Sequence, residues 1–314
     1  MLRILAVLLL LVVGGILFWF RESDEFLLSS PIPKVFGTDT KAKVNVWFPK
    51  DSSLRNFEDL YVGARGAIAV DYDSAEILFA KEPEMRLPIA STAKIMTALV
   101  ALENADSLSV FTVSEAASAV GENSMGLTTG EKLQLKELLY GLMLVSGNDA
   151  AVAIAEGIAG SQSSFVSMMN DKVRELGLDD THFVNATGLD EEGGNSHSTV
   201  YDMAVIAHYT WEKYELFRQI TATVHHYIEA TGTHRDFDLY NDTNLLTTYP
   251  GVLGIKPGFT WEAGLCLVTY VENEGKKIVA VILGSDDRRG EMKEILDYSF
   301  GKFGITVSHP ALDL

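Results

Sequence analysis

The sequence predicts an α+β fold, in which strands from both ends of one domain share an antiparallel sheet and helices pack on it. Near the start of the domain, strand-like runs at Ala67–Tyr72 and Glu76–Lys81 flank the turn residues Asp73-Ser74 and indicate a hairpin. Helical patterns dominate residues 105–245, and strand-like runs return after residue 250. This order of strands, helices and strands places both ends of the domain in one sheet.

The spacing of apolar residues predicts the individual elements in turn. The segment "ASTAKIMTALVALENA" has apolar residues at helical spacing and carries Ser91 near its start, so it is expected to form a helix. A loop rich in Gly, Asn and Asp, "NATGLDEEGGNSHS", interrupts the helices that follow. Three strands are expected at about 254–260, 264–272 and 277–284, before a final helix at about 289–301.

The composition is that of a folded, acidic protein. Of the 314 residues, 47% are hydrophobic and 22% are charged, and the formal net charge is −18. This charge argues against nucleic acid and against an anionic membrane surface as partners. The single cysteine, Cys266, lies in an apolar strand-like run and is predicted to be buried, so the monomer cannot contain a disulfide.

An uncharged apolar segment, residues 4–20, predicts a membrane anchor. As a helix these residues span about 25 Å, near the lower limit for crossing a bilayer. Arg3 precedes the segment and the acidic "RESDE" follows it, which favours a cytoplasmic N-terminus with the rest of the chain outside. A cleaved signal peptide is the alternative, although no small-residue cleavage site follows the apolar core.

These observations divide the chain into four parts. We predict an N-terminal transmembrane signal-anchor at residues 1–21, a tether or lead-in at 22–60, the main domain at 61–305 and a short C-terminal tail at 306–314. The breaks "SSPIPK" and "PKDSS" in the second part support its assignment as a loosely packed segment.

Three short patterns carry candidate chemistry: Ser91-Thr-Ala-Lys94, Ser146-Gly-Asn148 and Lys256-Pro-Gly258. Each pattern alone is a weak signal, because a second S-x-x-K occurs at Ser299–Lys302 and a second K-x-G at Lys302–Gly304. The S-x-N pattern occurs once in the chain, between Ser91-Thr-Ala-Lys94 and Lys256-Pro-Gly258. No S-x-N lies between the second S-x-x-K and the second K-x-G. The first set of patterns is therefore the candidate site.

Helix geometry gives Ser91 and Lys94 a possible catalytic relation. Side chains at i and i+3 lie on one face with Cβ atoms about 5–6 Å apart, so the amine can reach the serine oxygen. The positive end of the helix dipole favours a developing anion at Ser91. Burial and a second cation, for which Lys256 is the candidate, lower a lysine pKa toward the neutral form that a base requires. The alternative is a helix-capping serine followed by a solvated lysine.

Ser146-Gly-Asn148 falls between two helical patterns. A hydroxyl and an amide on a tight turn can point into a cleft, where they could pass protons and hold a substrate carbonyl. The alternative is a simple helix stop and restart, with Gly147 ending one helix and Asn148 or Asp149 capping the next.

Histidines do not add a metal site to this pattern. The spacing of His225, His226 and His234 fits no standard zinc motif, so these residues are expected at the surface or in loops.

Four segments in this order resemble serine-type D-alanyl-D-alanine carboxypeptidases, the low-molecular-weight penicillin-binding proteins of bacterial cell walls: "LPIASTAKIMTALVALE", "LMLVSGNDAAVAIAE", "THFVNATGLD" and "GIKPGFTWEAGLCLV". The likeness runs from about residue 62 to 301. It implies the penicillin-binding and serine β-lactamase fold, with a cleft between an antiparallel sheet and a mostly helical subdomain. Residues 61–305 would then be a D,D-peptidase catalytic domain.

The resemblance also implies catalytic roles. Ser91 would be the acylating nucleophile and Lys94 its general base, while Ser146 would relay a proton to the leaving amine. The backbone N–H groups of Ser91 and Phe259 would form the oxyanion hole. No metal or cofactor is implied.

Substrate-binding roles follow in the same way. Asn148 would hold the substrate backbone, and Lys256 would supply positive potential near the substrate carboxylate. Gly258 and Thr260 would complete the substrate-facing strand, with Thr260 close to the same carboxylate.

The third motif departs from the family pattern Lys-Thr-Gly, because Pro257 replaces the threonine. Backbone donors at i and i+2 point to the same side of a strand, so the nitrogens of Pro257 and Phe259 share an edge. If Phe259 N–H faces the substrate, Pro257 removes no bond within the sheet, and proline is tolerated on such an edge. Thr260, with Lys256, could supply the carboxylate contact that the missing hydroxyl ordinarily makes.

The resulting functional prediction is an acyl-serine D-alanyl-D-alanine carboxypeptidase. It would remove the terminal D-Ala from peptidoglycan stem peptides, and β-lactams such as penicillins would acylate it as inhibitors. The domain would lie outside the cytoplasm, in the periplasm or on the cell-wall side, held to the bacterial membrane by residues 4–20. Two alternatives remain: a D,D-endopeptidase acting on cross-links with the same residues, and a catalytically impaired penicillin-binding protein, which Pro257 suggests.

Overall fold

The computed structural model describes residues 46–50 and 60–309. The predicted anchor at residues 4–20 lies outside these ranges and stays a prediction. Within the described ranges, no helix is long and apolar enough to cross a membrane. The predicted tail is described as far as residue 309 and contains no helix or strand up to that point.

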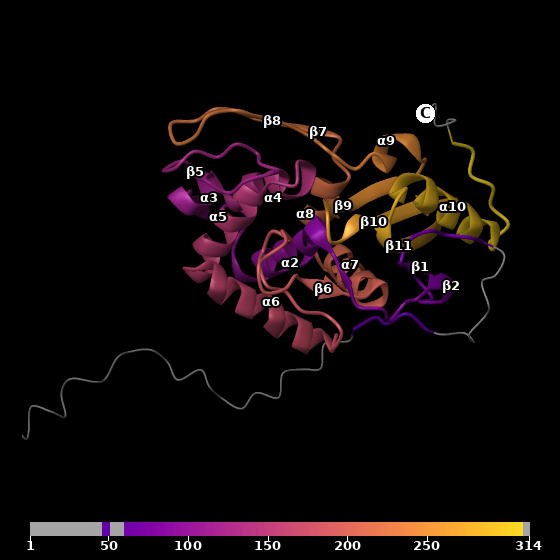
Figure 1. Ribbon diagram of the computed structural model, residues 1–314. Helices are drawn as coiled ribbons and strands as arrows, with labels where there is room; N and C mark the ends of the chain where they lie inside the picture. Colours follow the sequence, from indigo (N-terminus) through magenta and orange to yellow (C-terminus); the bar gives the residue numbers. More distant parts are fainter. Residues whose placement is uncertain (1–45, 51–59, 310–314) are drawn as a thin grey trace, which may run out of the picture. The chain divides into compact units, whose positions relative to one another are not determined.

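Strands from both ends of the domain form one five-stranded antiparallel sheet in the order β2-β1-β11-β10-β9 (Figure 1). β1 (Gly66–Asp71) and β2 (Ile77–Lys81) come from the beginning of the domain. β9 (Val252–Thr260), β10 (Gly264–Asn273) and β11 (Lys276–Ser285) come from its end. The prediction of an α+β domain with a shared sheet is therefore confirmed.

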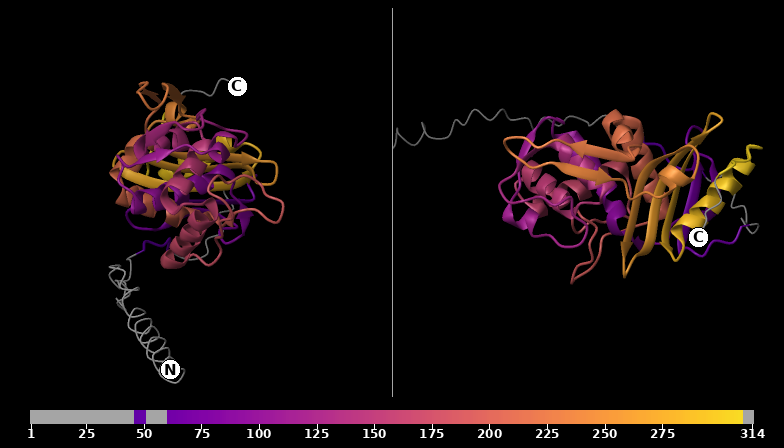
Figure 2. Two further views of the ribbon diagram at one scale, coloured as in Figure 1. Left: turned by 90° about the vertical axis from the view of Figure 1, so that its left-hand side faces the viewer. Right: turned by 90° about the horizontal axis from the view of Figure 1, so that it is seen from above.

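Helices cover both faces of this sheet. Figure 2 (right) shows α10 (Arg288–Gly301), in yellow, on one side and the helical region on the other. Side chains alternate between the faces along β1 and β11, as the two-residue period of a strand requires. The core beneath α10 includes Ala67, Ala69, Ala280 and Ile282, and the core on the helical side includes Ile68, Val70, Val279 and Val281.

The helical region begins with a short 3-10 segment, η1 (Ala90–Ala93), which continues directly into α2 (Lys94–Asn104). α4 (Leu135–Leu144), α5 (Asn148–Ala159), α6 (Gln162–Leu176) and α7 (Val200–Lys213) all contact α2. The shorter elements are β3 (Leu87–Pro88), β4 (Val110–Thr112), α3 (Glu115–Ser118), β5 (Lys132–Gln134), β6 (His197–Ser198), α8 (Glu215–Thr221), β7 (His225–Ile228), β8 (Phe237–Tyr240) and α9 (Leu245–Thr248).

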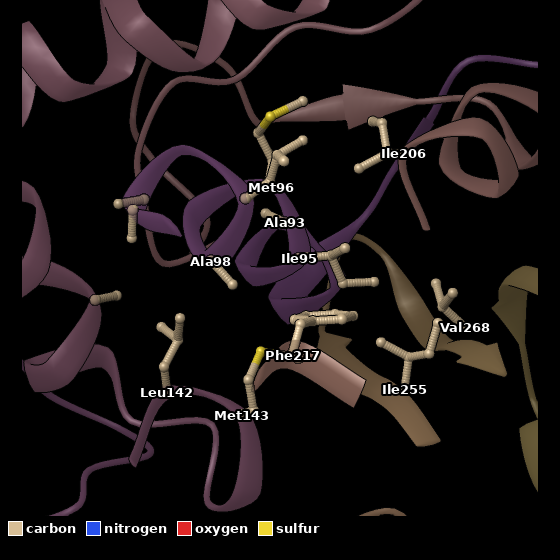
Figure 3. Close-up of a cluster of buried hydrophobic side chains, with 14 of the residues drawn as sticks. Ala93, Ile95, Met96, Ala98, Leu142, Met143, Ile206, Phe217, Ile255 and Val268 are labelled. Carbon is tan, nitrogen blue, oxygen red and sulfur yellow. The ribbon is translucent and has the colours of Figure 1, made fainter. Parts of the chain in front are cut away.

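α2 lies at the centre of the domain and is buried on all sides. Every residue from Lys94 to Ala101 is buried, as expected for a helix that is apolar around its whole circumference. Figure 3 shows its side chains among those of the surrounding elements, which include Leu142, Met143, Ile206, Phe217, Ile255 and Val268. This packing fixes the junction of η1 and α2, where Ser91 and Lys94 lie.

Residues 46–50, part of the predicted lead-in, pack against the domain. The Tyr201 hydroxyl donates a hydrogen bond to Pro49 O at 3.0 Å, and the rings of Trp47 and His208 stack with centroids 4.1 Å apart. This end of the lead-in is thus attached to α7.

Candidate active site

The three predicted motifs meet at one pocket beside β9, which we call the catalytic pocket. It has a volume of about 160 Å³. Its lining comes from η1, the turn between α4 and α5, β9, two further loops and the start of α10, and consists of Ser91, Glu122, Asn123, Ser146, Asn148, Asp242, Pro257, Gly258, Phe259 and Arg288. Segments more than 160 residues apart along the chain, at Ser91 and Gly258, therefore contribute to one site.

The nitrogen of Lys94 lies between three oxygen atoms. Lys94 Nζ is 2.9 Å from Ser91 Oγ, 2.8 Å from Asn148 Oδ1 and 2.5 Å from Thr187 O. Asn148 Oδ1 is fixed as an acceptor because the amide nitrogen of the same side chain donates to Gly121 O at 3.0 Å. A neutral amine has two hydrogens and one lone pair. In the neutral form, donation of these two hydrogens to Asn148 Oδ1 and Thr187 O would leave the lone pair for the Ser91 hydroxyl.

Burial and charge favour this neutral amine. The Lys94 side chain is fully buried, and this burial lowers the pKa of Lys94 well below its usual value. The positive charge of Lys256 lowers the pKa further, while Asp242 acts in the opposite direction. Lys94 is thus suited to accept a proton from Ser91, the activation that a serine nucleophile needs.

Lys256 is the second buried lysine of the site, and among the described residues its acidic partner is Asp242. Its Nζ lies 3.2 and 3.3 Å from the two carboxylate oxygens of Asp242. Burial lowers the pKa of Lys256, and Asp242 raises it again. Because a buried charge needs a partner, Asp242 stabilises the charged form of Lys256.

Arg288, at the start of α10, adds positive charge to the same end of the pocket. Its Nη1 donates to Gly258 O at 2.7 Å, which attaches α10 to β9. Sequence reasoning missed both Arg288 and Asp242. Neither residue belongs to a short motif. For Arg288, the signal that the sequence offers is its pairing with a second arginine, Arg289.

Ser146 has a strained backbone and an unpaired hydroxyl. Its φ is +59°, in the left-handed region that residues other than glycine rarely adopt. The residue is 2% exposed, and among the described residues its Oγ has no hydrogen-bond partner. Such strain concentrates at functional sites, where the surrounding structure maintains it. A substrate group in the catalytic pocket is the natural partner for this hydroxyl.

β9 approaches the start of η1 closely at Gly258. A Cβ atom at this position would lie 2.9 Å from Ser91 N and 3.1 Å from Ala90 Cβ, so only glycine fits without displacement. This approach brings the backbone of β9 beside the Ser91 amide, as a two-donor oxyanion hole with Phe259 requires. β9 is also the outer strand of the sheet, and Pro257 and Phe259 both line the pocket.

Thr260 lies further along β9 than the catalytic pocket. Its hydroxyl donates to Asp190 Oδ1 at 2.9 Å and accepts a hydrogen bond from Ala263 N at 3.1 Å. It lines an adjoining cavity of about 300 Å³, which we call the outer pocket, together with Glu122, Leu189, Asp190, Phe259 and Trp261. The structure therefore does not bring Thr260 to the pocket that contains Ser91, and its contact with the substrate carboxylate stays a prediction.

No cluster of three or more His, Cys, Asp or Glu residues in the described part of the chain could hold a metal ion. Cys266 is fully buried in β10, and burial raises the pKa of its thiol to about 11. The thiol is therefore unsuited to act as a nucleophile.

Asp242→Asn is expected to move both limbs of the pH–rate profile to lower pH. Asp242 raises the pKa of Lys94 and of Lys256, so its neutralisation lowers both. The acid limb follows deprotonation of Lys94, and the alkaline limb follows loss of the Lys256 charge. The measurement is the rate of Ser91 acylation against pH, with Asp171→Asn, a remote surface change, as the control. Limbs that stay in place or move upward would contradict this assignment.

The fold and the site define a class of serine enzymes in which a lysine is the base, as in penicillin-binding proteins. The chain belongs to the D-alanyl-D-alanine carboxypeptidase family, whose model matches residues 55–287. The family resemblance predicted from the sequence is thereby confirmed.

Individual relatives support the same assignment. D-alanyl-D-alanine carboxypeptidase DacF of Bacillus subtilis is 37% identical over 264 residues, which cover 82% of this chain and 67% of the relative. The D-alanyl-D-alanine carboxypeptidase of Streptomyces sp. strain K15 is 33% identical, over 76% of this chain and 88% of the relative.

Solved structures are similar over most of the described domain. The crystal structure of the Streptomyces K15 DD-transpeptidase has a TM-score of 0.72 and 30% identity, and covers 77% of this chain and 98% of that one. A penicillin-binding protein homologue from Mycobacterium tuberculosis has a TM-score of 0.73 and 29% identity, over 80% of this chain and 96% of that one.

Proposed function

We propose that this protein is an acyl-serine D,D-carboxypeptidase that removes the terminal D-Ala from peptidoglycan stem peptides. The contact of 2.9 Å between Lys94 Nζ and Ser91 Oγ carries this proposal, because the lysine is buried, has a lowered pKa and lies within hydrogen-bond distance of the hydroxyl. Membership of the D-alanyl-D-alanine carboxypeptidase family supplies the substrate class.

The reaction follows from the positions of the residues. Ser91 Oγ attacks the carbonyl carbon of the scissile amide while Lys94 Nζ takes the hydroxyl proton. The N–H groups of Ser91 and Phe259 stabilise the negative carbonyl oxygen. The Ser146 hydroxyl donates its proton to the leaving nitrogen and takes a proton back from Lys94, so D-Ala departs, Lys94 is neutral again and an ester on Ser91 remains. Water then attacks this ester with Lys94 again as the base, which restores Ser91 and releases the shortened peptide.

The positive charges of the cleft determine in which orientation the substrate peptide binds. Arg288 lines one end of the catalytic pocket, and Lys256 is buried behind it against Asp242, so their positive charges attract the terminal carboxylate to this end. The rest of the peptide then runs along β9 toward the outer pocket, past Phe259 and the highly exposed Trp261. This direction puts the scissile carbonyl beside Ser91.

A penicillin tests the first half of the reaction, since its strained amide acylates the same serine. We expect the full-length protein to form a covalent adduct with labelled penicillin and to release D-Ala from a D-Ala-D-Ala pentapeptide. Ser91→Ala abolishes both. The matched control is Ser299→Ala, in the second S-x-x-K pattern, whose hydroxyl only donates to Ile295 O within α10. This control keeps the adduct.

Other outcomes separate the alternatives. An adduct without D-Ala release favours a D,D-endopeptidase or a catalytically impaired penicillin-binding protein, and a cross-linked dimeric peptide distinguishes these two. Because a solved neighbour is titled a DD-transpeptidase, an added amine acceptor tests whether an amine replaces water at the ester. No adduct from folded protein contradicts the proposal.

We also propose that residues 4–20 hold the domain at the outer side of the membrane. The apolar sequence of this segment and the cell-wall substrate support this placement. The penicillin adduct then appears in the membrane fraction of cells, and deletion of residues 1–21 moves it to the soluble fraction. An adduct that is soluble in the full-length protein contradicts the anchor.

A further inference from the structure

A second cavity, with a volume of about 210 Å³, lies beside α9 and the beginning of α10. Figure 1 shows these two helices near each other at the end of the sheet that contains β9. We call this space the α9 cavity. Its polar lining consists of Arg289, Asn241, Thr243, Asn244, Thr247 and Thr248. None of the described residues that line it is an Asp or a Glu, although the whole chain carries 43 acidic residues against 25 basic ones.

Two polar atoms at the α9 cavity lack partners. Thr243 is 2% exposed, and neither its Oγ1 nor Arg289 Nε has a hydrogen-bond partner among residues 46–50 and 60–309. Folded proteins rarely leave such buried atoms unpaired. The residues around them already use their own groups, because Asn241 donates to Thr221 O and Thr223 O. A partner for these two atoms is therefore absent among the described residues.

The chemistry of the unpaired groups limits what this partner is. A guanidinium is always charged and can only donate hydrogen bonds, so its partner must be an acceptor. Arg289 also has no acidic partner within the described part of the chain. An oxygen acceptor with a negative charge satisfies both conditions, and the Thr243 hydroxyl can donate to the same group.

Two residues that line the α9 cavity are direct sequence neighbours of two residues that line the catalytic pocket. Thr243 directly follows Asp242, which holds Lys256, and Arg289 directly follows Arg288, which holds Gly258 O. Two neighbouring pairs of residues thus line two different cavities. A group bound between Thr243 and Arg289 therefore contacts the segments that position the cations of the catalytic pocket.

We propose that the α9 cavity is a binding site for a small oxyanion, a carboxylate or a phosphate group, held by Arg289 and Thr243. The site lies outside the catalytic pocket and does not depend on the carboxypeptidase reaction.

The test is a titration of the full-length protein with inorganic phosphate and, separately, with acetate. Chloride at matched ionic strength corrects for general screening of surface charges. We expect saturable shifts of the backbone amide resonances of residues 241–248 and 288–290, and the tighter of the two anions identifies the ligand chemistry. Arg289→Leu weakens this binding about ten-fold or more. Lys293→Leu, which removes the same charge one turn further along α10, leaves it unchanged.

Two more variants test whether anion binding belongs to the α9 cavity and not to the catalytic pocket. Thr243→Val removes a hydroxyl that has no partner, so it weakens anion binding without lowering the melting temperature of the free protein. Lys256→Gln removes a cation of the catalytic pocket and leaves the affinity of the α9 cavity unchanged. Shifts that do not saturate, or that persist in Arg289→Leu, overturn the proposal. Such results leave the penicillin test of the catalytic pocket unaffected.

Discussion

Lys94→Met is expected to slow the acylation of Ser91 by about 10²–10⁴-fold, the usual contribution of a general base. Lys94 Nζ is the nitrogen that contacts Ser91 Oγ, and methionine cannot accept the hydroxyl proton. Methionine has a similar volume, so the buried position on α2 stays filled. The measurement is the rate of adduct formation with labelled penicillin, with circular dichroism to verify the fold.

Lys172 provides a matched control, because it is also a buried lysine on a helix, α6, that contacts α2. Its Nζ lies 2.6 Å from Glu103 and 3.0 Å from Glu175. Burial lowers the pKa of Lys172, but hydrogen bonds to these two carboxylates outweigh burial and raise it overall. Lys172→Met should therefore reduce stability and leave acylation intact. Equal acylation by the Lys94→Met variant and the natural protein would show that another group is the base.

The parts of the site that could be predicted from the sequence are those fixed by local geometry. Ser91 and Lys94 are in contact because three residues of helix bring their side chains to one face. Ser146 and Asn148 are close because a single tight turn connects α4 with α5. The β1-β2 hairpin and the run β9-β10-β11 were predictable for a similar reason, since these strands have clear apolar runs and short connections.

The remaining parts depend on contacts between distant segments that carry no periodic pattern. Asp242 lies in a loop before α9, and its pairing with Lys256 appears only when β9 packs beside that loop. Thr260 illustrates the opposite case, since its motif position suggested a substrate contact but its hydroxyl bonds to Asp190 from a distant loop. A sequence motif identifies residues with reactive or polar side chains, whereas their contacts in the folded structure determine the role of each side chain.

Pro257 is compatible with the site because of where β9 lies. Within the described part of the chain, β9 is the outermost strand and pairs with β10 alone, so one of its edges has no neighbouring strand there. Proline is tolerated at such an edge because no ladder bond is lost there. Arg288 also holds β9 through Gly258 O, one residue further on, which supports the strand beside the proline.

Gly258→Ala is expected to lower the acylation rate by about 10²–10³-fold, the usual cost of losing one oxyanion-hole donor. The added methyl group would lie 2.9 Å from Ser91 N and 3.2 Å from Thr92 N. Both of these atoms belong to the backbone, so β9 and η1 must move apart. This movement separates the N–H groups of Ser91 and Phe259, which must converge on one oxygen.

The matched control is Gly301→Ala, since a Cβ atom at the end of α10 meets nothing within 4 Å. The control should acylate at the natural rate, whereas Gly258→Ala should keep its fold and lose the rate. Stabilisation of the carbonyl oxygen acts on the transition state, so the loss falls on the rate constant of acylation rather than on the initial binding of penicillin. An unchanged rate constant in Gly258→Ala would mean that the close approach of β9 to Ser91 does not form the oxyanion hole.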